Sequence, residues 1–318
     1  MKITLFWPPI PQGSWNFRIY PCLGSAYLDA VLRDRHDVSI IDSNIVHGKT
    51  AEFYKDYNEN NTPSKKVLVI WDNIIMNLIK ITERTQPDIL CVGSWSYNMP
   101  VVAEFTRKFK ARNPDIPIIL GGANPTLIPN ETLSALPYID YLARGEGEET
   151  IVELVETIEK KRELKDVKGI CFWKNNKIKH TPERGYIKKL DDLPFMDYEN
   201  FIGFKDWNSN PMEFLQVMTT RGCVGKCSFC TVYQIWKTER FYSPEYVNKQ
   251  IKHLLDLYDY KEQKVAFMDD NFVVNLDKTK KLINTFREKY SDYVWQIIDM
   301  RVEAMSKEFF DYISKNKC

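Results

Sequence analysis

DILCVGSWSYNMPVVAEFTRKFKARNPDIPIILGG, residues 88–122, places one long amphipathic run between two short apolar runs. The apolar runs show no alternation with polar residues, so they resemble strands that are buried on both faces. The run between them has the periodicity of a helix with one apolar face. Strand, helix and strand in this order predict a parallel sheet covered by helices, the doubly wound α/β fold. In that fold ligands bind at the carboxyl ends of the strands.

The same alternation extends outward from this stretch, from Met1 to about Thr157. Strands are expected at residues 2–7, 37–42, 88–94, 116–122 and 139–144, with helices at 24–34, 70–84, 99–113 and 148–162.

Composition narrows the class of protein. A net charge of +1 gives no sign of a nucleic-acid partner or an anionic membrane surface. The apolar runs are too short to span a bilayer, and the N-terminus lacks the pattern of a signal peptide. The 7 cysteines are too scattered for a disulfide framework. We therefore expect a cytoplasmic protein without a membrane span.

The second half contains a cysteine cluster, RGCVGKCSFC at residues 221–230. An expected strand precedes it, so one tight loop can direct Cys223, Cys227 and Cys230 inward. Structural zinc takes four ligands, usually from two separated pairs, and the chain has no second pair. Three thiolates suit a 4Fe–4S cluster with one iron left open. Zinc and a chance grouping of thiols are the alternatives.

Further strands and helices follow this loop. Ser243 is expected to cap a helix, and strands are expected near residues 264–268 and 293–300. The first of these strands ends in three polar residues, Asp269, Asp270 and Asn271. At the carboxyl end of a barrel strand such residues belong to the functional face. The alternative is that Asp270 or Asn271 caps the next helix.

Residues 161–210 differ from both flanks, with an expected hairpin turn at residues 175–176 and a proline-broken segment after it. We therefore predict a first domain over 1–160, a hairpin and linker over 161–210, and a partial (βα) barrel over 211–318.

The spacing CxxxCxxC, with Phe229 before the last cysteine, resembles the signature of the radical S-adenosylmethionine superfamily. GGANPTLIPNETL and IDYLARGEGEETIVELV, within residues 121–155, resemble the cobalamin-binding domain found in front of many such enzymes. The resemblance implies a 4Fe–4S cluster on the three cysteines, S-adenosylmethionine and cobalamin. It also implies a six-unit barrel, of which three units are counted here, so we expect a truncated chain.

The resemblance also implies roles for particular residues. Phe229 would pack near the adenine of S-adenosylmethionine, and the 269–271 strand end would meet its amino group. The corrin ring would lie over a set of strand-end residues: Ser94, Ser96, Gly121, Gly122 and Asn124. The DxHxxG motif that supplies a cobalt ligand in many corrinoid proteins is absent, and His36 and His47 are expected at the surface. Cobalt would then lack a protein histidine as axial ligand.

The activity implied is cleavage of S-adenosylmethionine to a 5′-deoxyadenosyl radical, followed by methylation of an unactivated carbon. The implied partners are a small-molecule substrate and a reductant such as flavodoxin or ferredoxin. Cyclisation and ring rearrangement are alternative outcomes. Two further alternatives are a non-catalytic corrinoid-binding module with a vestigial barrel, and a radical enzyme whose first domain is empty. No catalytic residue is assigned.

Overall fold

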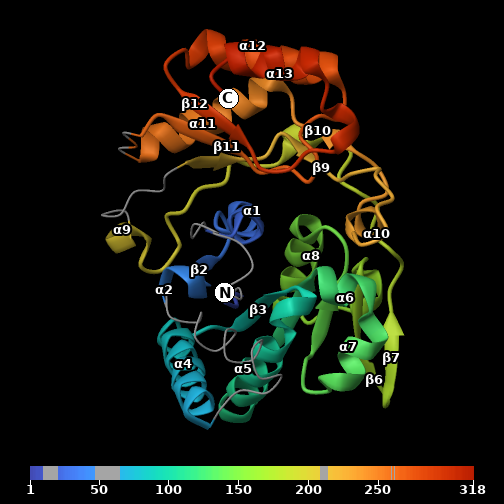
Figure 1. Ribbon diagram of the computed structural model, residues 1–318. Helices are drawn as coiled ribbons and strands as arrows, with labels where there is room; N and C mark the ends of the chain where they lie inside the picture. The colour runs from blue at the N-terminus through green and yellow to red at the C-terminus, as the bar shows by residue number, and fades with distance from the viewer. Residues whose placement is uncertain (10–20, 47–64, 208–213, 259, 261) are drawn as a thin grey trace. The chain divides into compact units, whose positions relative to one another are not determined.

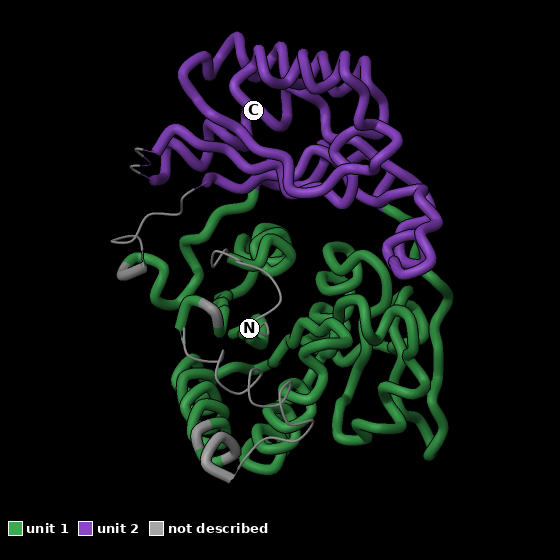
Figure 2. The backbone as a smooth tube through the Cα atoms, in the orientation of Figure 1, with its two compact units in different colours: residues 1–186, 196–207 green, residues 187–195, 208–318 purple. Residues whose placement is uncertain are grey.

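The computed structural model describes residues 1–9, 21–46, 65–207, 214–258, 260 and 262–318. Two compact units make up the chain (Figure 2). Unit 1 contains residues 1–186 and 196–207, and unit 2 contains residues 187–195 and 208–318.

Unit 1 is built on a 7-stranded sheet with the order β2-β1-β3-β4-β5-β6-β7 (Figure 1). The strands are β1 (Lys2–Trp7), β2 (Asp37–Asp42), β3 (Ile89–Ser94), β4 (Ile118–Gly122), β5 (Tyr141–Ala143), β6 (Ile170–Lys174) and β7 (Lys177–His180). β1 to β5 pair in parallel, as the apolar runs predicted. The chain leaves β1 and β3 in opposite directions along the sheet, and a doubly wound sheet binds ligands at the crevice between two such strands.

Helices cover this sheet, and the four longest lie where the sequence predicted helices. They are α1 (Leu23–Leu32), α2 (Ser43–Val46), α4 (Lys65–Arg84), α5 (Met99–Arg112), α6 (Ala123–Leu127), α7 (Pro129–Ala135), α8 (Gly147–Glu159) and α9 (Phe204–Trp207). α1 packs on α8, and α4 packs on α5. Right-handed crossovers place these two pairs on opposite faces of the sheet.

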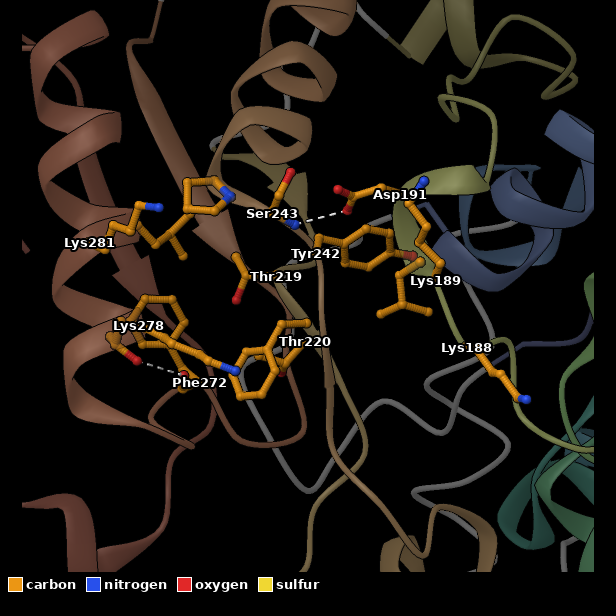
Figure 3. A pocket seen from close by; sticks show the side chains of 15 residues that line it. Lys188, Lys189, Asp191, Thr219, Thr220, Tyr242, Ser243, Phe272, Lys278 and Lys281 are labelled. Carbon is orange, nitrogen blue, oxygen red and sulfur yellow. Dashed lines mark hydrogen bonds between the residues drawn. The ribbon is translucent and has the colours of Figure 1, made fainter.

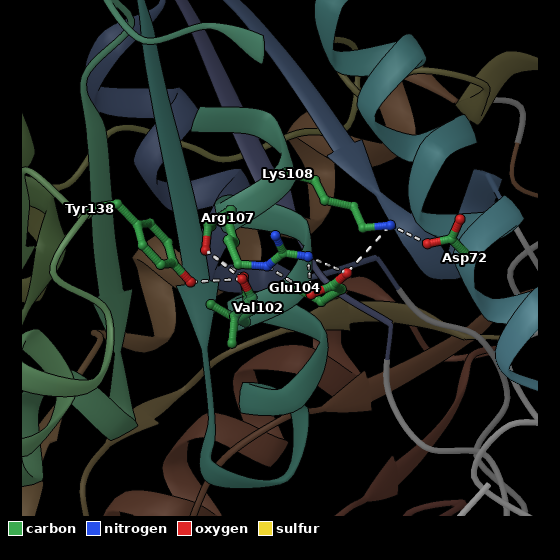
Figure 4. Close-up of polar contacts among 8 residues, drawn as sticks. Asp72, Val102, Glu104, Arg107, Lys108 and Tyr138 are labelled. Carbon is green, nitrogen blue, oxygen red and sulfur yellow. Dashed lines mark hydrogen bonds and ion pairs between the residues drawn. The ribbon is translucent and has the colours of Figure 1, made fainter. Parts of the chain in front are cut away.

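The core of unit 1 lies between the sheet and the α4–α5 layer. Phe6 of β1 stacks on Phe105 of α5 with ring centroids 3.9 Å apart. Cys91 is 7% exposed, which confirms it as a buried apolar side chain. On the outer side of this layer, Lys108 of α5 forms ion pairs with Glu104 and with Asp72 of α4 (Figure 4). The α4–α5 pair is therefore joined by apolar and ionic contacts.

The expected hairpin forms, but it belongs to unit 1. Asn175 and Asn176 form its turn with φ of 51° and 56°, the left-handed conformation that tight hairpins favour. β6 pairs antiparallel with β5, so the hairpin extends the sheet beyond the predicted boundary at residue 160. Residues 196–207 also join unit 1, because Ile202 N–H donates to Ile40 O of β2 at 2.9 Å.

Unit 2 contains a parallel 3-stranded sheet with the order β12-β11-β8. Its elements are β8 (Leu215–Val217), β9 (Thr220–Arg221), α10 (Val232–Ile235), β10 (Arg240–Phe241), α11 (Pro244–Leu257), β11 (Lys264–Phe267), α12 (Leu276–Lys289), β12 (Val294–Ile297) and α13 (Lys307–Lys315). The three predicted strands of the partial barrel are thereby present, each followed by a helix.

Side-chain caps fix where the helices of unit 2 begin. Ser243 accepts from Tyr246 N–H at 3.0 Å at the start of α11. Asn275 caps α12 by accepting from Lys278 N–H at 3.0 Å. The alternative that Asp270 or Asn271 caps this helix is therefore wrong, and both residues remain at the strand end. No helix in the described part of the chain has the length and apolarity needed to cross a membrane.

Gly122 is predicted to be indispensable for the fold of unit 1. Its φ is +103°, and an added Cβ would lie 2.3 Å from the backbone oxygen of Ser94. Gly122→Ala should lower the free energy of unfolding by about 2 kcal/mol or more, measured by urea denaturation. Gly185→Ala is the matched control, because an added Cβ there meets nothing within 4 Å. Equal effects of the two substitutions would contradict this assignment.

Candidate cofactor sites

The predicted corrin-binding residues lie where β3 and β4 end. Ser94 pairs with Gly122 in the parallel register, and its hydroxyl donates to Gly121 O at 2.9 Å. Asn124 is 6% exposed and accepts from Thr132 Oγ1 at 2.9 Å. The Ser94 side chain thus holds the backbone and the Asn124 side chain holds Thr132, whereas Gly121 and the exposed Ser96 leave their surfaces to a ligand.

Two aromatic side chains that sequence reasoning missed flank Ser96. Trp95 is 48% exposed and Tyr97 is 40% exposed, with ring centroids 5.6 Å apart. The buried Asn98 holds this turn by accepting from Trp95 N–H at 2.8 Å. Exposed rings beside a glycine strand end suit the apolar face of a large macrocycle. The only signal in the sequence was the aromatic pair directly after a strand end.

The histidines of unit 1 bear on the expected axial ligand. His36 lies before β2, at the edge of the sheet opposite to the carboxyl ends of β1 to β5. Burial lowers its pKa. His180 contacts Cys171 Sγ at 3.0 Å and Asn130 Oδ1 at 2.8 Å, so both ring nitrogens are engaged. His47 lies outside the described residues. The prediction that cobalt lacks a histidine ligand remains a prediction.

The cysteine loop is an excursion between β9 and β10, which pair antiparallel just beyond β8. Gly222 begins it with φ of +90°, and an added Cβ would lie 2.4 Å from Thr238 O. Cys223 and Cys230 are half-buried and Cys227 is exposed. Desolvation raises the pKa of the Cys223 thiol, and Gly225 N–H, which donates to Cys223 Sγ at 3.3 Å, opposes the rise.

The loop fits an iron–sulfur cluster in its donor set. All three ligand candidates are sulfur, and they lie on one short segment at the carboxyl end of the sheet. Among the residues that the structure describes, no group of three or more His, Cys, Asp or Glu is gathered closely enough to hold a metal ion. A cluster would therefore be held by the sulfur atoms of this one loop.

Asp269 has a role that its position in the sequence did not reveal. Its carboxylate is buried and accepts from Thr219 N–H, Thr219 Oγ1 and Thr220 N–H, each at 2.7 Å. These bonds join the end of β11 to the chain that leaves β8 toward the cysteine loop. Burial raises the pKa of Asp269 to about 6, although the three hydrogen bonds act in the opposite direction.

Asp270 and Asn271, the two residues after Asp269, make different contacts. Asp270 is an exposed residue whose pKa is raised by partial desolvation of its carboxyl group, and Gly222 N–H of the cysteine loop opposes that rise. Asn271 is 2% exposed; its Oδ1 accepts from Arg301 N–H at 3.2 Å and its Nδ2 donates to Glu239 at 3.4 Å. Of the predicted ligand residues at this strand end, only Asp270 presents an exposed polar group. Phe229 is 89% exposed on the loop itself.

Two charged residues, Glu239 and Arg301, lie beside the cysteine loop and were not assigned to it from the sequence. Glu239 accepts from Val224 N–H at 3.1 Å. Arg301 forms an ion pair with Glu303 at 2.8 Å and also packs on the loop at Gly225. They come from different elements, so nothing in the local sequence connects them.

A separate cavity of about 350 Å³ lies in unit 2 (Figure 3). Thr219 and Thr220, the partners of Asp269, form part of its wall, and four lysines line it against a single carboxylate, Asp191. Asp191 accepts from Ser243 N–H at 2.8 Å at the start of α11. None of the cysteines lines this cavity, so it is distinct from the cluster loop.

Comparison with known proteins agrees with both halves of this arrangement. The family profile of the B12 binding domain matches residues 66–155. An uncharacterized methyltransferase of Pyrococcus horikoshii is 29% identical over 321 residues, covering 100% of this chain and 64% of the relative. The anaerobic magnesium-protoporphyrin IX monomethyl ester cyclase of Rubrivivax gelatinosus is 31% identical over 160 residues, covering 47% of this chain and 28% of the relative.

Solved structures share the fold. The cobalamin-dependent S-adenosylmethionine radical enzyme OxsB superposes with a TM-score of 0.69 at 20% identity, covering 92% of this chain and 38% of OxsB. The radical S-adenosylmethionine methyltransferase TsrM of Kitasatospora setae gives a TM-score of 0.69 at 14% identity, covering 100% of this chain and 58% of TsrM. The chain thus spans less than two thirds of each of these proteins.

The fold and the sites define a corrinoid-type doubly wound domain joined to the first strands of a (βα) barrel with a three-cysteine loop. Residues 66–155 of the chain match the B12 binding domain, and the chain shares its fold with cobalamin-dependent radical S-adenosylmethionine enzymes.

Asp269→Asn is predicted to preserve the strand-end connection and to remove a pH dependence. Asparagine keeps an oxygen for the two N–H donors, and its amide can donate to the Thr219 hydroxyl. In the wild type the pKa of Asp269 is raised from 3.8 to about 6. Protonation of this carboxyl group therefore stabilises the fold, and the contribution is fully present below the lower of these two values. That contribution is lost as the pH rises through the higher value. Urea unfolding of wild type and variant across this interval measures the difference.

Asp277→Asn, at an exposed position in the first turn of α12, is the control and should leave the pH dependence unchanged. If Asp269→Asn keeps its stability but loses S-adenosylmethionine binding, the carboxylate acts on the ligand and the structural assignment is wrong.

Proposed function

We propose that this chain forms the cofactor-binding part of an enzyme that cleaves S-adenosylmethionine and methylates an unactivated carbon. The observation that carries the proposal is the three-cysteine loop at the carboxyl end of β8, in a chain that also contains a corrinoid-type sheet. Cys223, Cys227 and Cys230 would hold a 4Fe–4S cluster. When bound, the cluster supplies the electron that cleaves S-adenosylmethionine, and cobalamin supplies the methyl group.

The remaining residues of the loop region prepare this site. Asp269 fixes the start of the loop, and Asp270 offers a carboxylate to the amino group of S-adenosylmethionine. Phe229, exposed on the loop, provides an apolar surface for the adenine. Cobalamin would lie on unit 1, over Gly121 and Ser96.

Oxidative cyclisation is the second candidate activity. The magnesium-protoporphyrin cyclase of Rubrivivax gelatinosus matches 47% of this chain at 31% identity. Methyl transfer yields S-adenosylhomocysteine in addition to 5′-deoxyadenosine, whereas cyclisation yields 5′-deoxyadenosine without it. Assay of both products, in reduced and anaerobic protein, separates the two activities.

The partners follow from this chemistry. We propose a small-molecule substrate and a low-potential protein reductant such as flavodoxin or ferredoxin. The cytoplasm is the proposed location, since thiols that serve as cluster ligands must remain reduced.

Replacing Cys223, Cys227 and Cys230 together by Ala is predicted to abolish iron binding. Wild-type protein reconstituted anaerobically with iron and sulfide should gain the broad visible absorbance of a cluster, and the triple variant should not. Cys318→Ala removes an exposed thiol of the same unit and is the control. Chemical analysis of iron and sulfide gives the number of each bound per chain. Retained absorbance in the triple variant would falsify the ligand assignment, and zinc in its place would exclude the radical mechanism.

Gly121→Ala is predicted to weaken cobalamin binding without affecting stability. An added Cβ meets its nearest protein atoms only at 3.9 Å, so unit 1 has room for it. A bound macrocycle on the strand end would meet that methyl group. Titration with hydroxocobalamin should show at least about tenfold weaker binding, the effect of 1.4 kcal/mol. Unchanged affinity would show that cobalamin, if bound, does not approach this strand end.

A further inference from the structure

Arg301, which follows β12, lies directly against the cysteine loop. Gly225 is buried in the middle of this loop. A Cβ placed on Gly225 would lie 3.3 Å from Arg301 Nε and 3.2 Å from Cys223 Sγ. The guanidinium group and the first cysteine sulfur therefore pack against the same point of the loop. The glycine, which has no side chain, permits this close approach.

A chain of hydrogen bonds holds Arg301 in this position. Its backbone N–H donates to Asn271 Oδ1 at 3.2 Å, and Asn271 Nδ2 donates to Glu239 at 3.4 Å. Glu239 in turn accepts from Val224 N–H of the cysteine loop at 3.1 Å. Thr220 Oγ1 donates to Asn271 O at 3.2 Å, which anchors the buried Asn271. The ends of β11 and β12 and the loop are thereby connected through Asn271.

The charges around the loop are of both signs. Glu239 and Asp270 lie near Cys223 and are acidic, whereas Arg301 is the cation that packs on Gly225. Arg301 Nη2 also forms an ion pair with Glu303 at 2.8 Å, and Glu303 is largely exposed. Water screens the exposed Glu303 carboxylate more than it screens the guanidinium on the buried glycine. The field of Arg301 at the loop is therefore reduced by Glu303 but not cancelled.

We infer that the fixed positive charge of Arg301 raises the reduction potential of the cluster held by the loop. This inference rests on the proposed function, because it requires a cluster on the three cysteines. Reduction adds one electron to the cluster, taken from a low-potential donor, and makes it more negative. A nearby cation stabilises the reduced form more than the oxidised form, and net charge is one of the factors that set such potentials.

The test is the midpoint potential of the reconstituted cluster, followed by electron paramagnetic resonance during a titration with a titanium(III) or dithionite reductant. S-adenosylmethionine is omitted, so that ligand binding cannot move the potential. Arg301→Gln should shift the midpoint to a more negative value, and Arg301→Lys should shift it less. Glu303→Gln should shift it to a more positive value, since the carboxylate that opposes Arg301 is removed.

Lys289→Gln is the control for loss of one positive charge. Lys289 ends α12, which runs back from the carboxyl end of β11 to the opposite edge of the sheet. Its removal should leave the midpoint unchanged. If Arg301→Gln does not take up iron, the opposite shifts expected for Arg301→Lys and Glu303→Gln still decide the matter.

The outcomes separate the two proposals. Wild-type protein that takes up no iron and sulfide overturns the proposed function. A wild-type cluster whose midpoint is the same in Arg301→Gln and Glu303→Gln overturns only the inference about Arg301. Shifts of the same sign in these two variants also overturn it, because a charge effect must reverse with the sign of the charge that is removed.

Discussion

Parallel pairing of strands brings all their carboxyl ends to one edge of a sheet, and this constraint organises both units of the chain. In unit 1 it brings together Ser94 and Gly122, which are 28 positions apart in the sequence but adjacent in the register. In unit 2 it brings the loop after β8 next to the residues after β11 and β12. Each predicted site is therefore assembled by backbone pairing before any side chain contributes to it.

At the edge of unit 2, a buried carboxylate then fixes the local geometry. Within the described part of the chain Asp269 forms no ion pair, and its three hydrogen bonds compensate for its removal from water. All three donors belong to Thr219 and Thr220, which stand just before the cysteine loop. A neutral side chain without acceptors would leave two buried N–H groups unsatisfied, at a cost of about 1–3 kcal/mol each. The loop thus begins from a rigid point although its thiols remain exposed or half-buried.

The parallel strands and the longer helices were predictable because their signals are local: apolar runs, helical periodicity and Ser caps. The antiparallel pairing of β6 with β5 has no such local signal. This is why the hairpin was assigned to a linker. The roles of Asp269 and Asp270 were also beyond the sequence. Adjacent residues of an extended chain point to opposite sides, and nothing local says which of two identical carboxyl groups turns inward. Arg301 reaches the cysteine loop only through the tertiary fold.

Burial of two other cysteines has a consequence for how metal reaches this protein. Cys91 and Cys171 are buried, and desolvation raises the pKa of both thiols, that of Cys91 to about 12. Neutral thiols inside the sheet are poor ligands and poor nucleophiles. Under the proposed function, iron and sulfide supplied in excess would find few competing sulfur donors on unit 1, and assembly of a cluster would be favoured at the exposed loop of unit 2.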